Sequence, residues 1–439
     1  MSRTITIKKG LDINLISPPM GGNVNDTNPI FAIIPSDYPG YIWKSDVKEG
    51  DDVLSGTPLL HAKEDEQIRI CSPVAGKIKE IKRGERRKIE YISIHKSENL
   101  TSLEIPNNLE ILERLKLSGL FVMIRQRPFD IVPQSAEKPV NIFVTGFDSA
   151  PLAPDLIKTP LLPYLEKGLD TLNKLTSGKV YLSVRAESGI TSNVAEIVLV
   201  AGPHPAGNTG TQMAAIQPVN KGENVWMLDI ITACRIGKLM ETNKADFSTD
   251  VVVVGPEVEH PHTVSTWFGA SIQGLGKECF NSSKEDIRII SGNVLTGIPV
   301  SANGFLRYPY RQLTVIPEGA HRDEFMGWAS MNPKRYSVSH AFPAFLRGLK
   351  KPFQFDARIK GGERAMIMSG EYDKVFPMDI YPEYLLKAIM AKNIDRMEQL
   401  GIYEVAPEDF ALCEFVDSSK LELQKIVREG LDYLRKETM

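Results

Sequence analysis

The sequence has few cysteines, and they lie far apart. No two of its four cysteines are within forty positions of each other, and no C-x-x-C element occurs. A protein-held iron–sulfur cluster usually takes three or four closely spaced thiolates, so this spacing argues against a cluster. Scattered thiols without a pairing pattern are typical of a reducing compartment. The cysteines are Cys71, Cys234, Cys279 and Cys413.

Long apolar runs and an excess of charge of one sign are also missing. A membrane-spanning helix needs ~20 apolar residues, whereas the most apolar stretches, 197–202 and 251–255, have only the length of a strand. The N-terminus lacks the apolar core of a signal peptide. The 52 basic and 55 acidic residues give a net charge of −3, which does not favour nucleic acid as a partner. We therefore expect a cytoplasmic protein that reaches a membrane only through other chains.

Familiar catalytic motifs are absent as well. The sequence contains no G-x-S-x-G, H-E-x-x-H or Walker motif, each of which brings a nucleophile, metal or phosphate site with it. His260 and His262 form an H-x-H pair that could begin a metal site, but no third ligand follows at a recognisable spacing. We predict no catalytic residue and no metal ligand in this chain.

The first part of the chain is predicted to be all β. Over residues 29–96, short apolar runs alternate with glycine-containing turns, a pattern that favours a small sandwich or barrel. The stretches VKEGDDVLSGTPLL and CSPVAGKIKEIKRG resemble the barrel-sandwich hybrid of biotinyl and lipoyl carrier domains. Carrier domains modify a lysine in the central hairpin, but Lys63 stands before the acidic pair and does not match that motif. We predict a barrel-sandwich hybrid over 1–105 without a carrier lysine.

The next part alternates strands with a helix. Buried-type strands are predicted at 140–147, 179–186 and 196–202, with a helix over 161–175 and another apolar stripe of helical spacing in 107–125. Strand, helix and strand in this order indicate parallel β-α-β units. We expect a Rossmann-like α/β domain over 106–250.

The remaining sequence predicts a mixed unit followed by helices. Strands around one short helix near 270–275 favour a β-grasp (SLBB-like) domain over 251–330, and 331–378 is a connecting segment. The C-terminal helical domain, 379–439, is expected to begin with one helix that Asp379 caps and that Gly401 ends. A last helix is expected near Ser419, with Glu422 completing a capping box. The fold class is thus mixed α/β and α+β, with several domains.

One loop is a candidate ligand site. AGPHPAGNTGTQM, residues 201–213, directly follows the third predicted parallel strand, where α/β proteins usually bind ligands. Its spacing matches neither G-x-G-x-x-G nor a Walker loop, so a turn that only docks one domain on another is an equal alternative. We select Gly202, His204, Gly207, Asn208 and Gly210 as candidate ligand-binding residues.

A basic segment, 77–88, has two interpretations of equal weight. Its seven basic side chains, against three glutamates within 77–90, suit either contact with an acidic partner or anionic headgroups, or plain exposure to solvent.

Stretches along nearly the whole chain resemble one family, the A subunit of the Na⁺-translocating NADH:quinone reductase. They occur in the family's order, and together they are far more specific than any one alone. They are IKKGLDI at 7–13, SPVAGKI with RGERR at 72–87, AGPHPAGNTGTQM at 201–213, VWMLDIITACRIGKL at 225–239, ISGNVLTG at 290–297, EGAHRDEFMGW at 318–328, GGERAMIMSGEYDKVFPMDIYPEYLL at 361–386 and EDFALCEFV at 408–416.

The resemblance implies a role inside a larger machine. The family is related to the C subunit of the Rnf complex and to the flavin-carrying subunit of complex I. It implies that flavins and an iron–sulfur cluster sit in partner subunits and that membrane-embedded subunits move Na⁺. It also implies that this chain takes part in the reduction of quinone, which is then a ligand of the chain. The competing hypotheses are an independent FMN-dependent NADH dehydrogenase, a purely structural scaffold and a carrier modified on Lys63.

Overall fold

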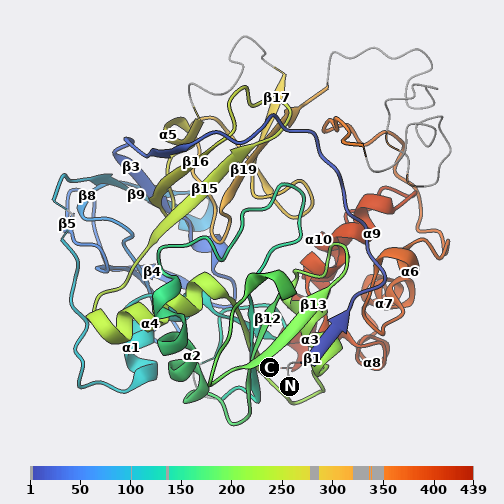
Figure 1. Ribbon diagram of the computed structural model, residues 1–439, viewed down its shortest axis with the longest axis horizontal. Coiled ribbons are helices and arrows are strands. Elements are labelled where there is room, and N and C mark those ends of the chain that lie inside the picture. Colours follow the sequence, from blue (N-terminus) through green and yellow to red (C-terminus); the bar gives the residue numbers. More distant parts are fainter. Residues whose placement is uncertain are drawn as a thin grey trace.

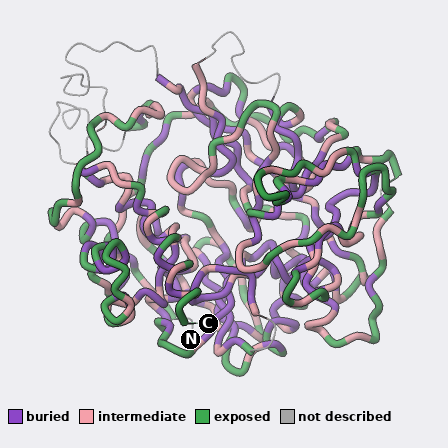
Figure 2. The backbone as a smooth tube through the Cα atoms, turned by 180° about the vertical axis from the view of Figure 1, so that it is seen from behind, coloured by how far each residue is buried: buried purple, intermediate pink, exposed green. Residues whose placement is uncertain are grey.

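The computed structural model describes residues 3–99, 101–134, 138–276, 286–319, 336, 338 and 351–438. The sheets and the C-terminal helices form separate regions, with the helices on one side of the molecule (Figure 1). Figure 2, the view from behind, shows buried backbone running through the region where they meet. No helix in the described part of the chain has the length and apolarity needed to cross a membrane.

The barrel-sandwich hybrid predicted from the resemblance to carrier domains is present. A four-stranded sheet in the order β3-β9-β8-β5 packs on a three-stranded sheet in the order β4-β6-β7. Leu59, Leu60, Ile70 and Ile92 are almost fully buried in this unit. The strands are β3 (Ile30–Ile33), β4 (Trp43–Ser45), β5 (Asp52–Val53), β6 (Pro58–Ala62), β7 (Arg69–Cys71), β8 (Gly76–Arg83) and β9 (Ile89–Lys96).

The Rossmann-like unit is a six-stranded sheet in the order β1-β13-β12-β11-β14-β10. All neighbours in it are parallel except β10, which runs antiparallel to β14. The central strands are apolar on both faces because helices cover both. The elements are β1 (Arg3–Thr6), α1 (Ile111–Leu117), β10 (Arg125–Arg127), β11 (Asn141–Thr145), α2 (Leu165–Asn173), β12 (Val180–Val184), β13 (Glu196–Ala201), α3 (Thr209–Ile216), β14 (Val225–Asp229) and α4 (Ile230–Thr242).

Helices α2 and α4 lie unusually close together on one face of this sheet. A Cβ atom on Gly168 would lie 1.9 Å from the carbonyl oxygen of Ala233, and one on Gly237 would lie 2.0 Å from that of Tyr164. Only glycine permits such an approach of two backbones. The prediction of a helix within 161–175 is confirmed, whereas the helix predicted over 107–125 is limited to α1.

The third unit is a mixed sheet in the order β18-β17-β19-β15-β16-β2, next to the short helix α5 (Ile272–Gly276). Its strands are β2 (Asn23–Asn25), β15 (Ser248–Val254), β16 (His262–Trp267), β17 (Ile287–Ser291), β18 (Ile298–Val300) and β19 (Gln312–Pro317). Parts of the region predicted as 251–330 and of the connecting segment 331–378 lie outside the described residues, and so do Cys279 and most of the stretch 318–328.

The N-terminal residues join units that are distant in sequence. Strand β1 pairs with β13 in the Rossmann-like sheet, Leu15 forms a bridge to Phe353, and β2 pairs with β16 in the third sheet. The predicted boundaries assign these residues to the barrel-sandwich hybrid instead. Nothing in a three- or four-residue strand identifies its partner, since pairing depends on which sheet edge the fold leaves open.

The C-terminal helices are α6 (Tyr372–Val375), α7 (Pro382–Met390), α8 (Ile394–Gln399), α9 (Ala411–Val416) and α10 (Leu423–Thr438). The single helix predicted from Asp379 to Gly401 is wrong, because α7 ends at Met390 and Asn393 caps a separate helix, α8. Pro382 does occupy the first turn, but the N-cap is Tyr381. Gly401 has a φ of +86°, the left-handed conformation expected for it.

The last helix starts later than predicted. Helix α10 begins at Leu423, and Ser419 does not cap it, because the Ser419 hydroxyl donates to the carbonyl oxygen of Ala365. The apolar stripe of α10 is buried as expected and packs on α7 in a separate hydrophobic core. Its fully buried members are Leu423, Val427, Leu431 and Leu434.

Candidate functional site

The glycine-rich loop between β13 and α3 is in tight contact with other parts of the chain. Gly202 has a φ of +125°, and a Cβ atom there would lie 2.2 Å from the carbonyl oxygen of Ile7. A Cβ on Gly207 would lie 2.5 Å from the amide nitrogen of Ser149. A Cβ on Gly210 would lie 2.5 Å from a carboxylate oxygen of Asp409. The absence of a side chain at the three glycines thus lets other parts of this chain pack against the loop backbone, and these positions are not open to a ligand.

His204 is locked inside this junction. It is only 3% exposed; its backbone N–H donates to Asp12 Oδ1 at 2.8 Å, and its carbonyl accepts from the N–H of Leu11 at 2.8 Å. The ring atom Nδ1 lies 3.0 Å from Ser149 Oγ, which also accepts from the N–H of Gly207. Burial lowers the pKa of His204 to about 4, so the ring is neutral at physiological pH.

The other predicted loop residues complete the junction. Asn208 is the N-cap residue of α3, but its side chain makes no capping hydrogen bond. The structure places Gly202, His204, Gly207 and Asn208 in the loop and Gly210 in the first turn of α3. The three glycines and His204 contact parts of the chain that are distant in sequence. Their role toward a ligand stays a prediction.

A cavity of about 380 Å³ opens beside this loop, at the carboxyl ends of β11 and β12. The side chain of Arg185 connects the cavity to the loop. It donates to the carbonyl oxygens of Val200 and Gly202 at 3.2 and 3.0 Å, and its guanidinium lies 4.3 Å from the centre of the Phe147 ring. The lining residues are Gly146, Phe147, Asp148, Ala153, Pro154, Asp155, Leu156, Ile157, Arg185, Glu187 and Ser188.

The cavity has both apolar and polar walls. Phe147, Leu156 and Ile157 offer apolar surface, whereas Asp148 and Glu187 are exposed carboxylates. The volume falls within the ~300–1,000 Å³ typical of small-molecule sites. Sequence reasoning missed this cavity. Its one signal was the proline-rich loop 146–157, which leaves a buried strand at a glycine.

The usual ligand crevice of a doubly wound sheet is closed in this protein. The strand order reverses between β11 and β14, and ligands of this fold class bind outside the strand ends at such a reversal. Here Asp229, at the end of β14, caps α4 and binds Arg311 of the third unit at 2.6 Å. Burial raises the pKa of Asp229, but the Arg311 guanidinium outweighs it and holds that pKa below its usual value. The crevice therefore serves as a contact between units.

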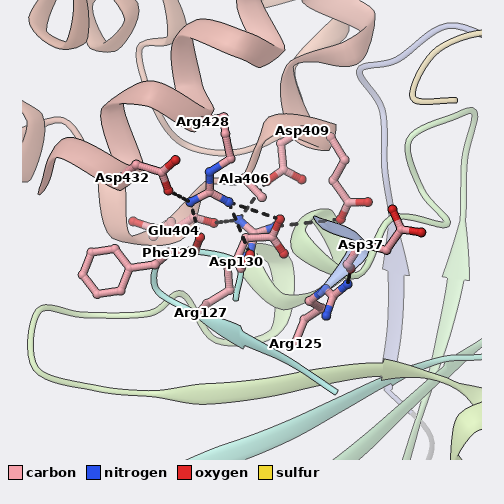
Figure 3. Close-up of polar contacts among 11 residues, drawn as sticks. Asp37, Arg125, Arg127, Phe129, Asp130, Glu404, Ala406, Asp409, Arg428 and Asp432 are labelled. Atoms are coloured by element: carbon pink, nitrogen blue, oxygen red, sulfur yellow. Dashed lines mark hydrogen bonds and ion pairs between the residues drawn. The ribbon is translucent and has the colours of Figure 1, made fainter. Parts of the chain in front are cut away.

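A buried ion pair fixes the C-terminal helices on the Rossmann-like unit (Figure 3). Arg127, at the end of β10, is fully buried; its Nη1 donates to Asp409 Oδ2 at 3.0 Å and to the carbonyl oxygen of Glu404 at 2.7 Å. Arg428 of α10 donates to the carbonyl oxygen of Phe129 at 2.6 Å. Arg127 of the Rossmann-like unit thus binds the C-terminal helices, and Arg428 of those helices binds the Rossmann-like unit. The sequence analysis identified neither arginine.

The other features of the sequence give no assembled site. Lys63 is exposed in the turn between β6 and β7. His262 begins β16 while His260 lies in the preceding bend, so the two rings do not share a strand face. No group of three or more potential metal ligands occurs among the described residues. The basic segment 77–88 covers most of β8 and the short turn that precedes β9, and its role stays a prediction. Cys71, Cys234 and Cys413 are buried thiols.

Three family models match consecutive parts of the chain. They are described as the NqrA N-terminal barrel-sandwich hybrid domain over residues 5–97, the NqrA second alpha/beta domain over 107–245 and the NQRA C-terminal domain over 251–302. Among solved structures, an NAD⁺-reducing [NiFe]-hydrogenase in the air-oxidized state is similar with a TM-score of 0.34 and 10% identity, over 69% of this chain and 55% of that one. That likeness is too weak to support an argument.

Several relatives match from end to end. The A subunit of the Na(+)-translocating NADH-quinone reductase of Pasteurella multocida is 36% identical over 99% of this chain and 100% of its own length. The proteins of the same name from Hahella chejuensis and Vibrio atlanticus are each 35% identical with the same coverage. At this identity over the whole length, the chain belongs to the family of Na⁺-translocating NADH-quinone reductase A subunits.

Proposed function

We propose that this chain is a peripheral cytoplasmic subunit of a Na⁺-translocating NADH:quinone reductase and supports the reduction of quinone to quinol that is coupled to Na⁺ export. In this proposal partner subunits attach it to the inner face of the cell membrane and carry the flavins and the iron–sulfur cluster. The observation that carries the proposal is the match to A subunits over 99% of the chain.

We further propose that the quinone headgroup binds in the cavity at the ends of β11 and β12. A quinone ring needs an apolar slot with a few hydrogen-bonding groups, and Phe147, Leu156 and Ser188 supply both kinds of surface there. In this proposal the loop residues Gly202–Gly210 do not touch the quinone. They position the cavity wall, because the carbonyl oxygen of Gly202 accepts a hydrogen bond from the Arg185 side chain, which lines the cavity. The proposal differs from the sequence prediction, in which the loop itself contacts the ligand.

The carboxylates at the cavity suit the chemistry. Reduction of a quinone to a quinol takes up two electrons and two protons. The electrons come from carriers in partner subunits, and Asp148 and Glu187, both exposed at the cavity, can pass protons from solvent to the two quinone oxygens. The chain's own contribution is thus binding, orientation and proton delivery.

Blocking the cavity tests this proposal. Ala153→Trp places an indole into the cavity, whereas Ala186→Trp places the same group on the adjacent exposed turn, outside the lining residues. In the assembled complex, Ala153→Trp should raise the KM for a short-chain quinone about tenfold or more, and Ala186→Trp should leave it unchanged. Unchanged quinone kinetics in the Ala153→Trp complex would refute the cavity as the site.

The alternatives predict different spectra. An independent FMN-dependent NADH dehydrogenase would be yellow as purified and would oxidise NADH without partners. The packing of Ile7 and Asp409 against the loop glycines leaves little room there for a flavin phosphate, which disfavours that hypothesis. A colourless chain that assembles but does not respond to any quinone would leave the scaffold role. A carrier would show a mass increase on Lys63.

A further inference from the structure

Helix α7 is apolar on both sides. Leu385, Leu386 and Ile389 are buried against the C-terminal core, yet its outward positions include Tyr384, 58% exposed, and Met390, 54% exposed. Tyr381, which precedes the helix, is 69% exposed. A helix with apolar residues around most of its circumference is normally covered on both sides, whereas Tyr381, Tyr384 and Met390 are exposed here.

The exposed apolar residues of the described ranges concentrate in the sequence that leads into and forms α7. Of the eleven large hydrophobic side chains that are exposed in the described ranges, six lie between residues 359 and 390. Glu383 Oε1 accepts the N–H groups of Ser369 and Gly370 at 3.0 and 2.9 Å, so it ties the preceding loop to α7. The rings of Tyr381 and Tyr384 meet edge to face at 6.1 Å. We define the α7 patch as Tyr381, Tyr384, Lys387 and Met390.

The charge in the α7 patch restricts what can cover it. Lys387 is exposed between Tyr384 and Met390 and has no ion-pair partner in the described part of the chain. One cation is too few for a lipid surface, which is recognised by clusters of about four to eight basic residues. A second copy of this chain, placed by a two-fold axis beside Lys387, would bring two Lys387 ammonium groups together, and one placed by an axis elsewhere in the α7 patch has no carboxylate among the patch residues to pair with Lys387. Neither occupant fits.

We propose that the α7 patch is the docking surface for another protein subunit of the reductase, one whose contact face is apolar and carries a carboxylate opposite Lys387. The proposal rests on membership of the A-subunit family. Tyrosine and methionine are typical of the buried centre of protein interfaces, and a single buried ion pair there fixes the register of two apolar faces.

A photo-crosslinking experiment in the whole complex tests this inference. p-Benzoylphenylalanine in place of Tyr384 should crosslink to another subunit of the reductase. The matched control position, Ile42 on the barrel-sandwich hybrid, is 60% exposed and should give no such product. A crosslink only to a second copy of this chain, only to phospholipid, or to nothing would overturn the proposal.

Affinity measurements with purified chains separate docking from folding. Tyr384→Glu should weaken assembly about 30-fold, and Lys387→Glu about tenfold, without lowering the melting temperature of the isolated chain. Lys44→Glu, at an exposed lysine near Ile42, is the control. Wild-type affinity in both patch variants would refute the inference. Because assembly is measured without quinone, failure of the quinone proposal leaves this result unaffected.

Discussion

Replacement of Arg127 by methionine should loosen the C-terminal helices from the rest of the chain. The Arg127 side chain is fully buried and that of Asp409 is 1% exposed. Removing one member of a buried pair leaves the other charge without compensation, which costs about 3–5 kcal/mol. We expect the free energy for opening of α10 to fall by that amount.

A matched control makes the origin of this loss clear. Lys221 and Glu398 also join the Rossmann-like unit to the C-terminal helices, at 2.7 Å, but the Lys221 side chain is 68% exposed. An exposed pair contributes about 0–1 kcal/mol, so Lys221→Met should have little effect. The double variant Arg127→Met with Asp409→Leu should recover much of the loss, because neither member of the buried pair then carries a charge.

Native-state hydrogen exchange of the α10 amides measures this opening without assuming that the whole chain unfolds at once. Burial raises the pKa of Asp409 even beside Arg127, and loss of the cation raises it further. The Arg127→Met deficit should therefore shrink as the pH falls and Asp409 takes up a proton. A deficit below about 1 kcal/mol, equal to that of Lys221→Met, would refute the reasoning.

Two further predictions concern the junction loop. His204 has a pKa of about 4 instead of 6.5 because it is buried, so the unfolded chain alone takes up a proton as the pH falls from 6.5 to 4. Denaturation at several pH values should show about 3 kcal/mol of stability lost over that range, and His204→Asn should remove most of this loss; parallel curves for the two proteins would contradict it. Gly202→Ala should cost more than about 2 kcal/mol, because it adds a clash with the Ile7 carbonyl to the left-handed strain. Gly222→Ala is the control, because Gly222 has a φ of +85° and no atom lies within 4 Å of an added Cβ, so this variant has backbone strain without a clash. Equal melting temperatures for the two alanine variants would show that the Ile7 contact is unimportant.

The site was only partly visible in the sequence. The loop after β13 was identified because a buried strand followed by glycines marks the end of a parallel strand. Its packing against Ile7 and Asp409 was not visible, since these residues lie about 200 positions away in opposite directions. The cavity escaped notice for a similar reason: its wall needs Arg185 and Phe147 from two different strand ends.

The sequence by itself determined the local elements and the family. Apolar periodicity and glycine turns specify strands and helices because they depend on neighbours within a few residues. Only the tertiary structure decided that β1 and β2 join two different sheets, that the strand-order crevice is closed by Arg311, and that Arg127 meets Asp409. Such contacts depend on which sheet edges and charges remain unpaired after the units have folded, and that is a property of the assembled chain rather than of any one segment.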